Sequence, residues 1–268
     1  MTDLPAALTA EETRTLDTAL SLDAALNLDM ALNLGEAQAR AVLAALPSSR
    51  GAQAAARALA LGRPHLTLEW TDEPLLLAAA HLRLGRPDAA LGTLGGLPDT
   101  ARPALLRARA ALQGGALDAL AQATHARTLA RADGDGGALV VAATLLAEHH
   151  LRAGAQHEAL RTLAEGLKVA EMTGQPADPH LLAVLAHAQK PLNARKAAAT
   201  AAKALDRSEP GSPARVLALL ALDRPEDAHA QAQRGSLAAA WWEPFARLVS
   251  AARPPATTPE TDGTAADG

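Results

Sequence analysis

The 268-residue chain contains no cysteine, no tyrosine and a single phenylalanine. Without cysteine it can form neither disulfide bonds nor thiolate metal sites, which fits a reducing compartment and leads us to expect a cytoplasmic location. Because the only other aromatic residues are three tryptophans, alanine and leucine must make up most of the core. These residues suit close helix–helix packing better than a β-sandwich. The composition therefore predicts an all-α protein.

Long apolar runs and an excess of positive charge are also lacking. Charged residues interrupt every apolar run before about 18 residues, so we expect no transmembrane helix. The opening residues, MTDLPAALTAEE, lack the basic and apolar regions of a signal peptide. The formal net charge of −4 gives no net attraction to nucleic acid or to an anionic membrane. Neither is therefore expected as a partner.

The stretch Ala138–Thr173 carries the clearest helical pattern. Apolar residues recur at i, i+3, i+4 and i+7, stop at Gly154 and then restart, which predicts two antiparallel helices joined by a short turn. Such a hairpin cannot bury its apolar face alone and needs similar neighbours. The same signals predict helices at 36–46, 52–61, 74–84, 87–95, 102–114, 117–132, 180–189, 194–205, 214–222 and 225–233, with at most two turns at 63–70.

The two ends of the chain differ from this pattern. Thr15–Leu34 repeats a six-residue unit, LDTALS-LDAALN-LDMALN. Its alternation is typical of a strand, but leucine, alanine and aspartate are poor strand residues and no other segment offers a strand to pair with, so we favour a helix. From Arg253 the chain has too few apolar residues to fold. We predict an N-terminal segment at 1–34, a helical domain at 35–252 and a disordered tail at 253–268.

Two helical turns are nearly identical in sequence. His81–Leu94 reads HLRLGRPDAALGTL and His150–Leu163 reads HLRAGAQHEALRTL. Both place alanine five residues after the turn glycine, as do weaker copies in which Gly114 precedes Ala119 and Asp223 replaces the glycine before Ala228. The repeated positions that we expect to pack between paired helices are Ala78, His81, Gly85, Ala90, Gly114, Ala119, Ala147, His150, Gly154, Ala159 and Leu163.

This pattern resembles the tetratricopeptide repeat, from about residue 52 to residue 235. The turn glycines are 23, 29 and 40 residues apart, against about 34 in the family, and the family's tryptophan, tyrosines and closing proline are missing. The chain is similar to divergent repeats in bacterial signal-responsive transcription regulators. The resemblance implies a right-handed superhelix of antiparallel helix pairs that binds a peptide or protein on its surface.

No arrangement of residues in the sequence indicates catalysis or a cofactor. His149, His150 and His157 lack a histidine or carboxylate four residues later, and His65 with Glu69 supplies only two ligands. The glycine- and aspartate-rich stretch 133–137 lacks the glutamate that a calcium loop needs at its twelfth position. No triad of serine, histidine and aspartate stands out. We therefore expect a non-catalytic protein with no metal and no cofactor.

Two clusters are candidates for partner binding. One is a basic run that consists of Lys190, Arg195, Lys196, Lys203 and Arg207. It suits an acidic peptide, nucleic acid or the acidic N-terminal part of another copy, although the lack of aromatics disfavours nucleic acid and a solvated helix face is the simpler interpretation. The other is Trp241 and Trp242, which we place with Phe245 on a last helix capped by Ser236 and kinked at Pro244. One tryptophan is expected to cover the end of the repeat array and the other to serve as an anchor for a partner.

The sequence thus favours a cytoplasmic scaffold that binds a protein or peptide of unknown identity. One alternative is a sensory or oligomerising subunit associated with transcription regulation. No basic recognition helix is evident, so the DNA-binding part would have to be another chain. A second alternative is self-assembly through residues 1–34, which would make the protein a homo-oligomer.

Overall fold

The computed structural model describes residues 51–251. The hexad segment, the helix expected at 36–46, the tail and both predicted domain boundaries lie outside the described residues, and so does the hypothesis of self-assembly through residues 1–34. Within 51–251 every regular element is helical, with thirteen α-helices and one 3₁₀ turn. The all-α prediction is therefore confirmed for this part of the chain.

The helices follow the expected ranges closely. In the first half they are α3 (Gly51–Ala60), α4 (Pro64–Trp70), α5 (Pro74–Arg83), α6 (Pro87–Leu94), α7 (Ala101–Gly114), α8 (Ala119–Ala132) and α9 (Gly136–Arg152). In the second half they are α10 (Gln156–Met172), α11 (Pro179–Gln189), α12 (Ala194–Arg207), α13 (Pro213–Ala221), α14 (Pro225–Arg234) and α15 (Glu243–Ala251).

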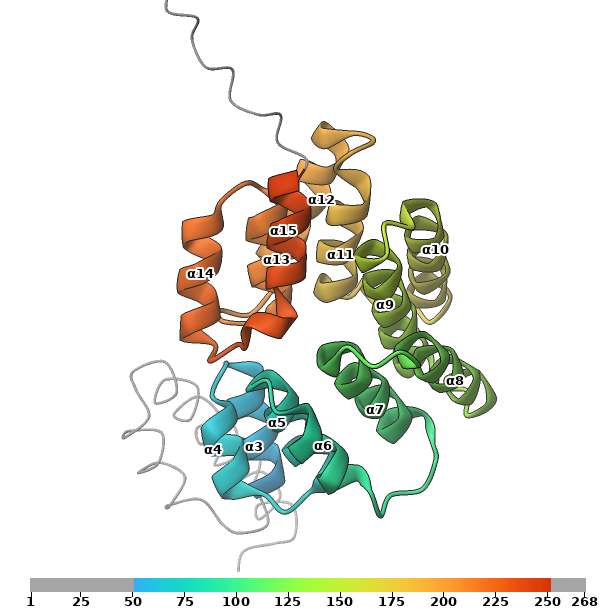
Figure 1. The fold of residues 1–268 in the computed structure, drawn as a ribbon, viewed down its shortest axis with the longest axis vertical. Coiled ribbons are helices and arrows are strands. Elements are labelled where there is room, and N and C mark those ends of the chain that lie inside the picture. The colour runs from blue at the N-terminus through green and yellow to red at the C-terminus, as the bar shows by residue number, and fades with distance from the viewer. Residues whose placement is uncertain (1–50, 252–268) are drawn as a thin grey trace, which may run out of the picture.

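The helices form two layers. Each helix from α3 to α14 packs on its neighbours in sequence, and the odd-numbered helices α5, α7, α9, α11 and α13 also pack on one another in order. Figure 1 shows α8, α10, α12 and α14 at the periphery of this row. Successive helix pairs therefore stack side by side, as expected for an array of helical repeats.

The same turn joins several of the helix pairs. In the two matching copies, the Arg86 N–H donates to the His81 carbonyl (2.9 Å) and the Ala155 N–H to the His150 carbonyl (2.8 Å). The glycine just before each donor has a φ of 70° or 74°, a conformation that glycine adopts without steric cost. Asp223 adopts the same conformation, with a φ of 58°, in the place that the repeat assigns to glycine.

In the third copy the turn residue is Gly115, not Gly114. Gly114 is the last residue of α7, whereas Gly115 has a φ of 70°. Six of the positions predicted to pack between helices are buried: Ala78, Ala90, Ala147, Ala159 and Leu163 have no exposed surface and Ala119 is nearly enclosed. The prediction is wrong for Gly85, Gly114 and Gly154, which are exposed at the ends of their helices. His81 and His150 are partly exposed.

The two ends of the described chain meet where the turn after α3, the loop before α13 and the turn after α14 come together, which closes the row into a ring (Figure 1). Arg83 donates hydrogen bonds to the carbonyls of Leu59 (2.8 Å) and Gly211, which lie at opposite ends of the row. Beside it, three glycines approach so closely that a Cβ on Gly235 would lie 1.9 Å from the Gly211 carbonyl oxygen, and one on Gly62 would lie 2.7 Å from the Gly235 Cα. Only residues without a side chain fit this seam.

The expected last helix is wrong in its boundaries. Ser236 lies in a turn with a φ of 46°, and Ala239–Trp241 forms a separate 3₁₀ turn before α15 begins at Glu243. Pro244 therefore lies in the first turn of a new helix instead of kinking an existing one. An N–H in the first turn has no partner within the helix, so a proline there costs no hydrogen bond. Its ring also avoids the clash with the preceding turn that it would cause inside a helix.

Candidate functional site

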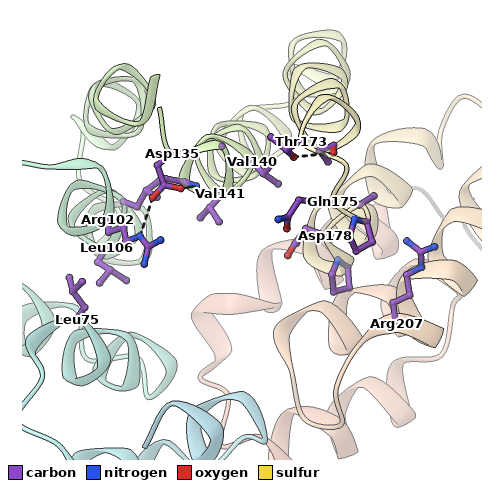
Figure 2. Close-up of a pocket in the computed structure, with 18 of the residues that line it drawn as sticks. Leu75, Arg102, Leu106, Asp135, Val140, Val141, Thr173, Gln175, Asp178 and Arg207 are labelled. Atoms are coloured by element: carbon purple, nitrogen blue, oxygen red, sulfur yellow. Dashed lines mark hydrogen bonds and ion pairs between the residues drawn. The ribbon is translucent and has the colours of Figure 1, made fainter. Parts of the chain in front are cut away.

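The main pocket lies where the first turns of four helices meet. It has a volume of about 1250 Å³ and is bounded by the N-terminal ends of α5, α7, α9 and α11, the C-terminal end of α10 and the loop before α11. In Figure 2, Leu75, Leu106, Arg102 and Val141 lie on one side of the pocket, and Gln175, Asp178 and Arg207 on the other. The pocket thus joins segments more than a hundred residues apart.

Its wall is largely apolar. Leucine and valine pairs lie in the first two turns of three helices: Leu75 and Leu76, Leu105 and Leu106, Val140 and Val141. Val141 is 47% exposed, which is unusual for a valine beside buried helix contacts. An exposed apolar wall within a concave site is a feature of ligand-binding surfaces.

The two carboxylates of the pocket are already engaged. Asp135 accepts the Ala138 N–H at 2.9 Å and pairs with Arg102 at 3.0 Å, and these interactions lower its pKa, the Ala138 N–H most of all. Asp178 accepts the backbone N–H groups of His180 and Leu181 at 2.8 and 3.0 Å. Both carboxylates cap a helix, so neither is free to hold a cation.

Apart from these paired groups, the charge around the pocket is positive. Arg207 lines the pocket, and within the described chain its side chain has no hydrogen-bond or ion-pair partner. The N-terminal ends of four helices add partial positive charge from their aligned peptide dipoles. The pocket is therefore suited to an apolar ligand that carries a negative group.

The structure separates the residues of the predicted basic run. The Lys190 ammonium bonds to the Ala221 carbonyl (2.9 Å) and to Asp223 (2.8 Å), which ties α11 to the turn after α13. Arg195, Lys196 and Lys203 are exposed on α12. Helical geometry places Lys196, Lys203 and Arg207 within about 40° of one another, so a basic face on α12 leads to the pocket, whereas Arg195 points elsewhere.

The two tryptophans lie in different surroundings. The Trp241 indole N–H donates to the Leu82 carbonyl at 2.8 Å, and the Arg109 guanidinium lies 4.5 Å from the centre of the Trp241 ring. The Trp242 ring instead meets His229 edge-on, with centroids 5.9 Å apart. Both side chains are partly buried. Trp241 links the N-terminal core around α5 to the C-terminal core around α13.

A buried ionic cluster beside Trp241 was not predicted from the sequence. The two terminal nitrogens of Arg109 contact the two Glu148 oxygens at 2.5 and 2.6 Å, and the His180 Nε2 lies 2.8 Å from the same carboxylate. Burial is the largest single influence on the pKa of Glu148 and would raise it, but the charge and hydrogen bonds of Arg109, together with His180, outweigh that effect and hold the pKa well below its usual range. The cluster joins α7, α9 and α11, and every oxygen of the carboxylate is used within it.

Searches against protein-family models, curated proteins and solved structures found no match to this chain. Across residues 51–251, no three histidine, aspartate or glutamate side chains gather closely enough to hold a metal ion. In the same range no helix is both long and apolar enough to cross a membrane.

Proposed function

We propose that this protein is a non-catalytic scaffold that binds a peptide or protein segment in the pocket bounded by α5, α7, α9 and α11. The observation that carries the proposal is the apolar wall with the exposed Val141, which faces a concave space bordered by Arg207, a side chain without a partner in the part of the chain that the structure describes. Helical repeat arrays commonly bind extended or helical segments on such surfaces. The segment it fits has apolar side chains for the wall and a carboxylate for Arg207.

We also propose that the array is a divergent tetratricopeptide-type right-handed superhelix and that the protein acts in the cytoplasm. The repeated turn after His81 and His150, the buried small residues and the two-layer stacking support the repeat type. The cysteine-free composition supports the location.

Selection of a displayed random peptide library on the full chain tests the binding site. We expect enrichment of apolar peptides that contain aspartate or glutamate. Val141→Asp should weaken their binding roughly tenfold or more, because it places a charge in the apolar wall. Arg207→Glu should weaken it as well, with a smaller effect at high salt, where exposed charges are screened.

Leu117→Asp is the matched control for these variants. Leu117 is fully exposed and lies in the turn between α7 and α8, outside the pocket. The same peptides should bind this variant as they bind the unaltered chain. Equal binding to the Val141→Asp variant, or no enrichment at all, would reject the pocket as the site.

A further inference from the structure

The segment between α14 and α15 crosses from the C-terminal helices to the inner, odd-numbered helices. We call residues 237–242 the strap. It follows the turn at Gly235 and Ser236 and contains one 3₁₀ turn, Ala239–Trp241. Figure 1 shows this part of the chain turned toward α5 and α7. A segment with so little regular structure is held mainly by the surface on which it lies.

Main-chain groups provide the first set of contacts. The Ala238 N–H donates to the Arg83 carbonyl at 2.9 Å, and the Ala240 carbonyl accepts from the Arg152 guanidinium at 3.3 Å. Carbonyls in the last turn of a helix lack a partner within the helix, so the end of α5 offers acceptors to any passing chain. These contacts use the backbone of the strap and not the identity of its side chains.

One aromatic side chain provides the second set. The Trp241 N–H bonds to the Leu82 carbonyl, its ring lies 4.5 Å from the Arg109 guanidinium carbon, and its edge faces His180. A guanidinium next to an indole ring is an attractive pair. Arg109 is also held by Glu148, so its position does not depend on the strap alone.

The space between the strap and the end of α5 limits the size of the side chain at position 238. A Cβ on Gly85 would lie 2.7 Å from the Ala238 Cβ, so the strap and α5 approach too closely for a large side chain. The surface therefore selects a small residue followed three positions later by tryptophan. Among the described residues the buried Arg152 Nε has no hydrogen-bond partner, which leaves a donor for one more acceptor on a ligand.

We propose that α5, α7, α9 and α11 form a second binding surface, for a segment that has a small residue three positions before a tryptophan and forms a single 3₁₀ turn between them. The strap occupies this surface as an intramolecular ligand. A partner with the same pattern binds by displacing the strap. This surface is separate from the pocket around Val141, and the proposal does not depend on the function proposed for that pocket.

Competition with a synthetic peptide tests the proposal on the full chain. The probe is a fluorescein-labelled copy of residues 236–246, SLAAAWWEPFA, and binding is followed by fluorescence anisotropy. Trp241→Ala removes the anchor of the intramolecular competitor, so this variant should bind the probe at least about tenfold more tightly than the unaltered chain. A probe with alanine in the Trp241 place should lose this binding.

Ala238→Pro is a milder second variant in case Trp241→Ala fails to fold. Ala238 has a φ of −63°, which proline adopts, but the change replaces the N–H donated to Arg83 with a ring carbon that crowds the Arg83 carbonyl, so it weakens the contact of the strap with α5. Loss of one hydrogen bond should tighten probe binding by about three- to tenfold. Hydrogen exchange at the end of α5 should also become faster, because the strap no longer covers it.

Two control variants test whether the gain in probe binding comes from release of the strap. Trp242→Ala, whose ring lies against His229, should give no gain in probe binding. Val141→Asp should leave probe binding unchanged, which distinguishes this surface from the pocket. If folded Trp241→Ala and Ala238→Pro variants bind the probe no more tightly than the unaltered chain, or if Trp242→Ala gains as much as they do, the proposal is wrong.

Discussion

His187 couples the stability of the protein to pH. It is buried on α11, with its Nε2 2.9 Å from the Leu217 carbonyl and its ring centre 4.9 Å from that of Phe245. Burial lowers the pKa of His187 from 6.5 to about 4. Between these values the unfolded chain binds a proton that the folded chain does not, so stability falls as the pH drops through this window.

We therefore expect His187→Gln to reduce the loss of stability between pH 7 and pH 5 by roughly 2 kcal/mol. Urea unfolding at the two pH values measures the difference, and comparison within each variant cancels the cost of the substitution itself. Some dependence should remain, because burial also lowers the pKa of His81 and His149. His157→Gln, on an exposed position of α10, should behave as the unaltered chain; an equal effect there would contradict the assignment to His187.

The residues of the ionic cluster show where reasoning from sequence stops. Glu148 lies inside an apolar helical stripe and Arg109 between alanines, and such interruptions can be noticed in the sequence. Their pairing cannot, because it depends on the stacking of α7 against α9 across 39 residues. Likewise, the sequence indicates that Arg207 is part of a basic run, but only the fold shows that it lines the same pocket as the leucines of α5 and α7.

At the scale of helices and turns, local chemistry decides most boundaries. Proline begins α5, α6, α11, α13 and α14, and the glycine turns end their partners, so nearly every helix was predicted from these signals. The last helix was not, because the strap takes its shape from distant acceptors at the end of α5. The turn between α7 and α8 was predicted one residue too early, at Gly114 instead of Gly115, because two adjacent glycines offer equivalent turn positions in the sequence.

We predict opposite effects on stability for alanine substitutions at the two adjacent glycines of the turn between α7 and α8. Gly114 is helical and Gly115 has a φ of 70°, and a Cβ on either would meet no other atom within 4 Å. Gly114→Ala should stabilise the fold by about 0.5–1 kcal/mol, because alanine loses less backbone entropy in a helix. Gly115→Ala should destabilise it by about 1 kcal/mol, because alanine is strained in the left-handed region. Changes of the same sign in urea unfolding would contradict this account of the turn.

At the scale of the whole molecule, the helix pairs and their order follow from the sequence, but ring closure does not. Stacking of neighbours uses local repeats, whereas the seam joins Gly62, Gly211 and Gly235 across the full length of the described chain. Each glycine also has an ordinary local role as the end of a helix or a loop. Nothing in their spacing indicates that they meet.

Ring closure therefore gives the last prediction. Gly235→Ala would place a methyl group 1.9 Å from the Gly211 carbonyl oxygen, and backbone atoms on both sides leave no side chain that could move away. The seam must separate, with a loss of stability of about 1–3 kcal/mol that is typical of overpacking. Small-angle scattering should report a larger radius of gyration, and hydrogen exchange should become faster at α3, α5 and residues 209–212.

Gly96→Ala is the matched control, because Gly96 is exposed and a Cβ there meets nothing within 4 Å. It should change neither scattering nor exchange. If Gly235→Ala also leaves both unchanged, the two ends of the array are not held together by the seam.

Separation of the seam would also lengthen the path that the strap has to cross between Ser236 and α5. The strap proposal then predicts that Gly235→Ala, like Trp241→Ala, binds the residue 236–246 peptide more tightly than the unaltered chain does.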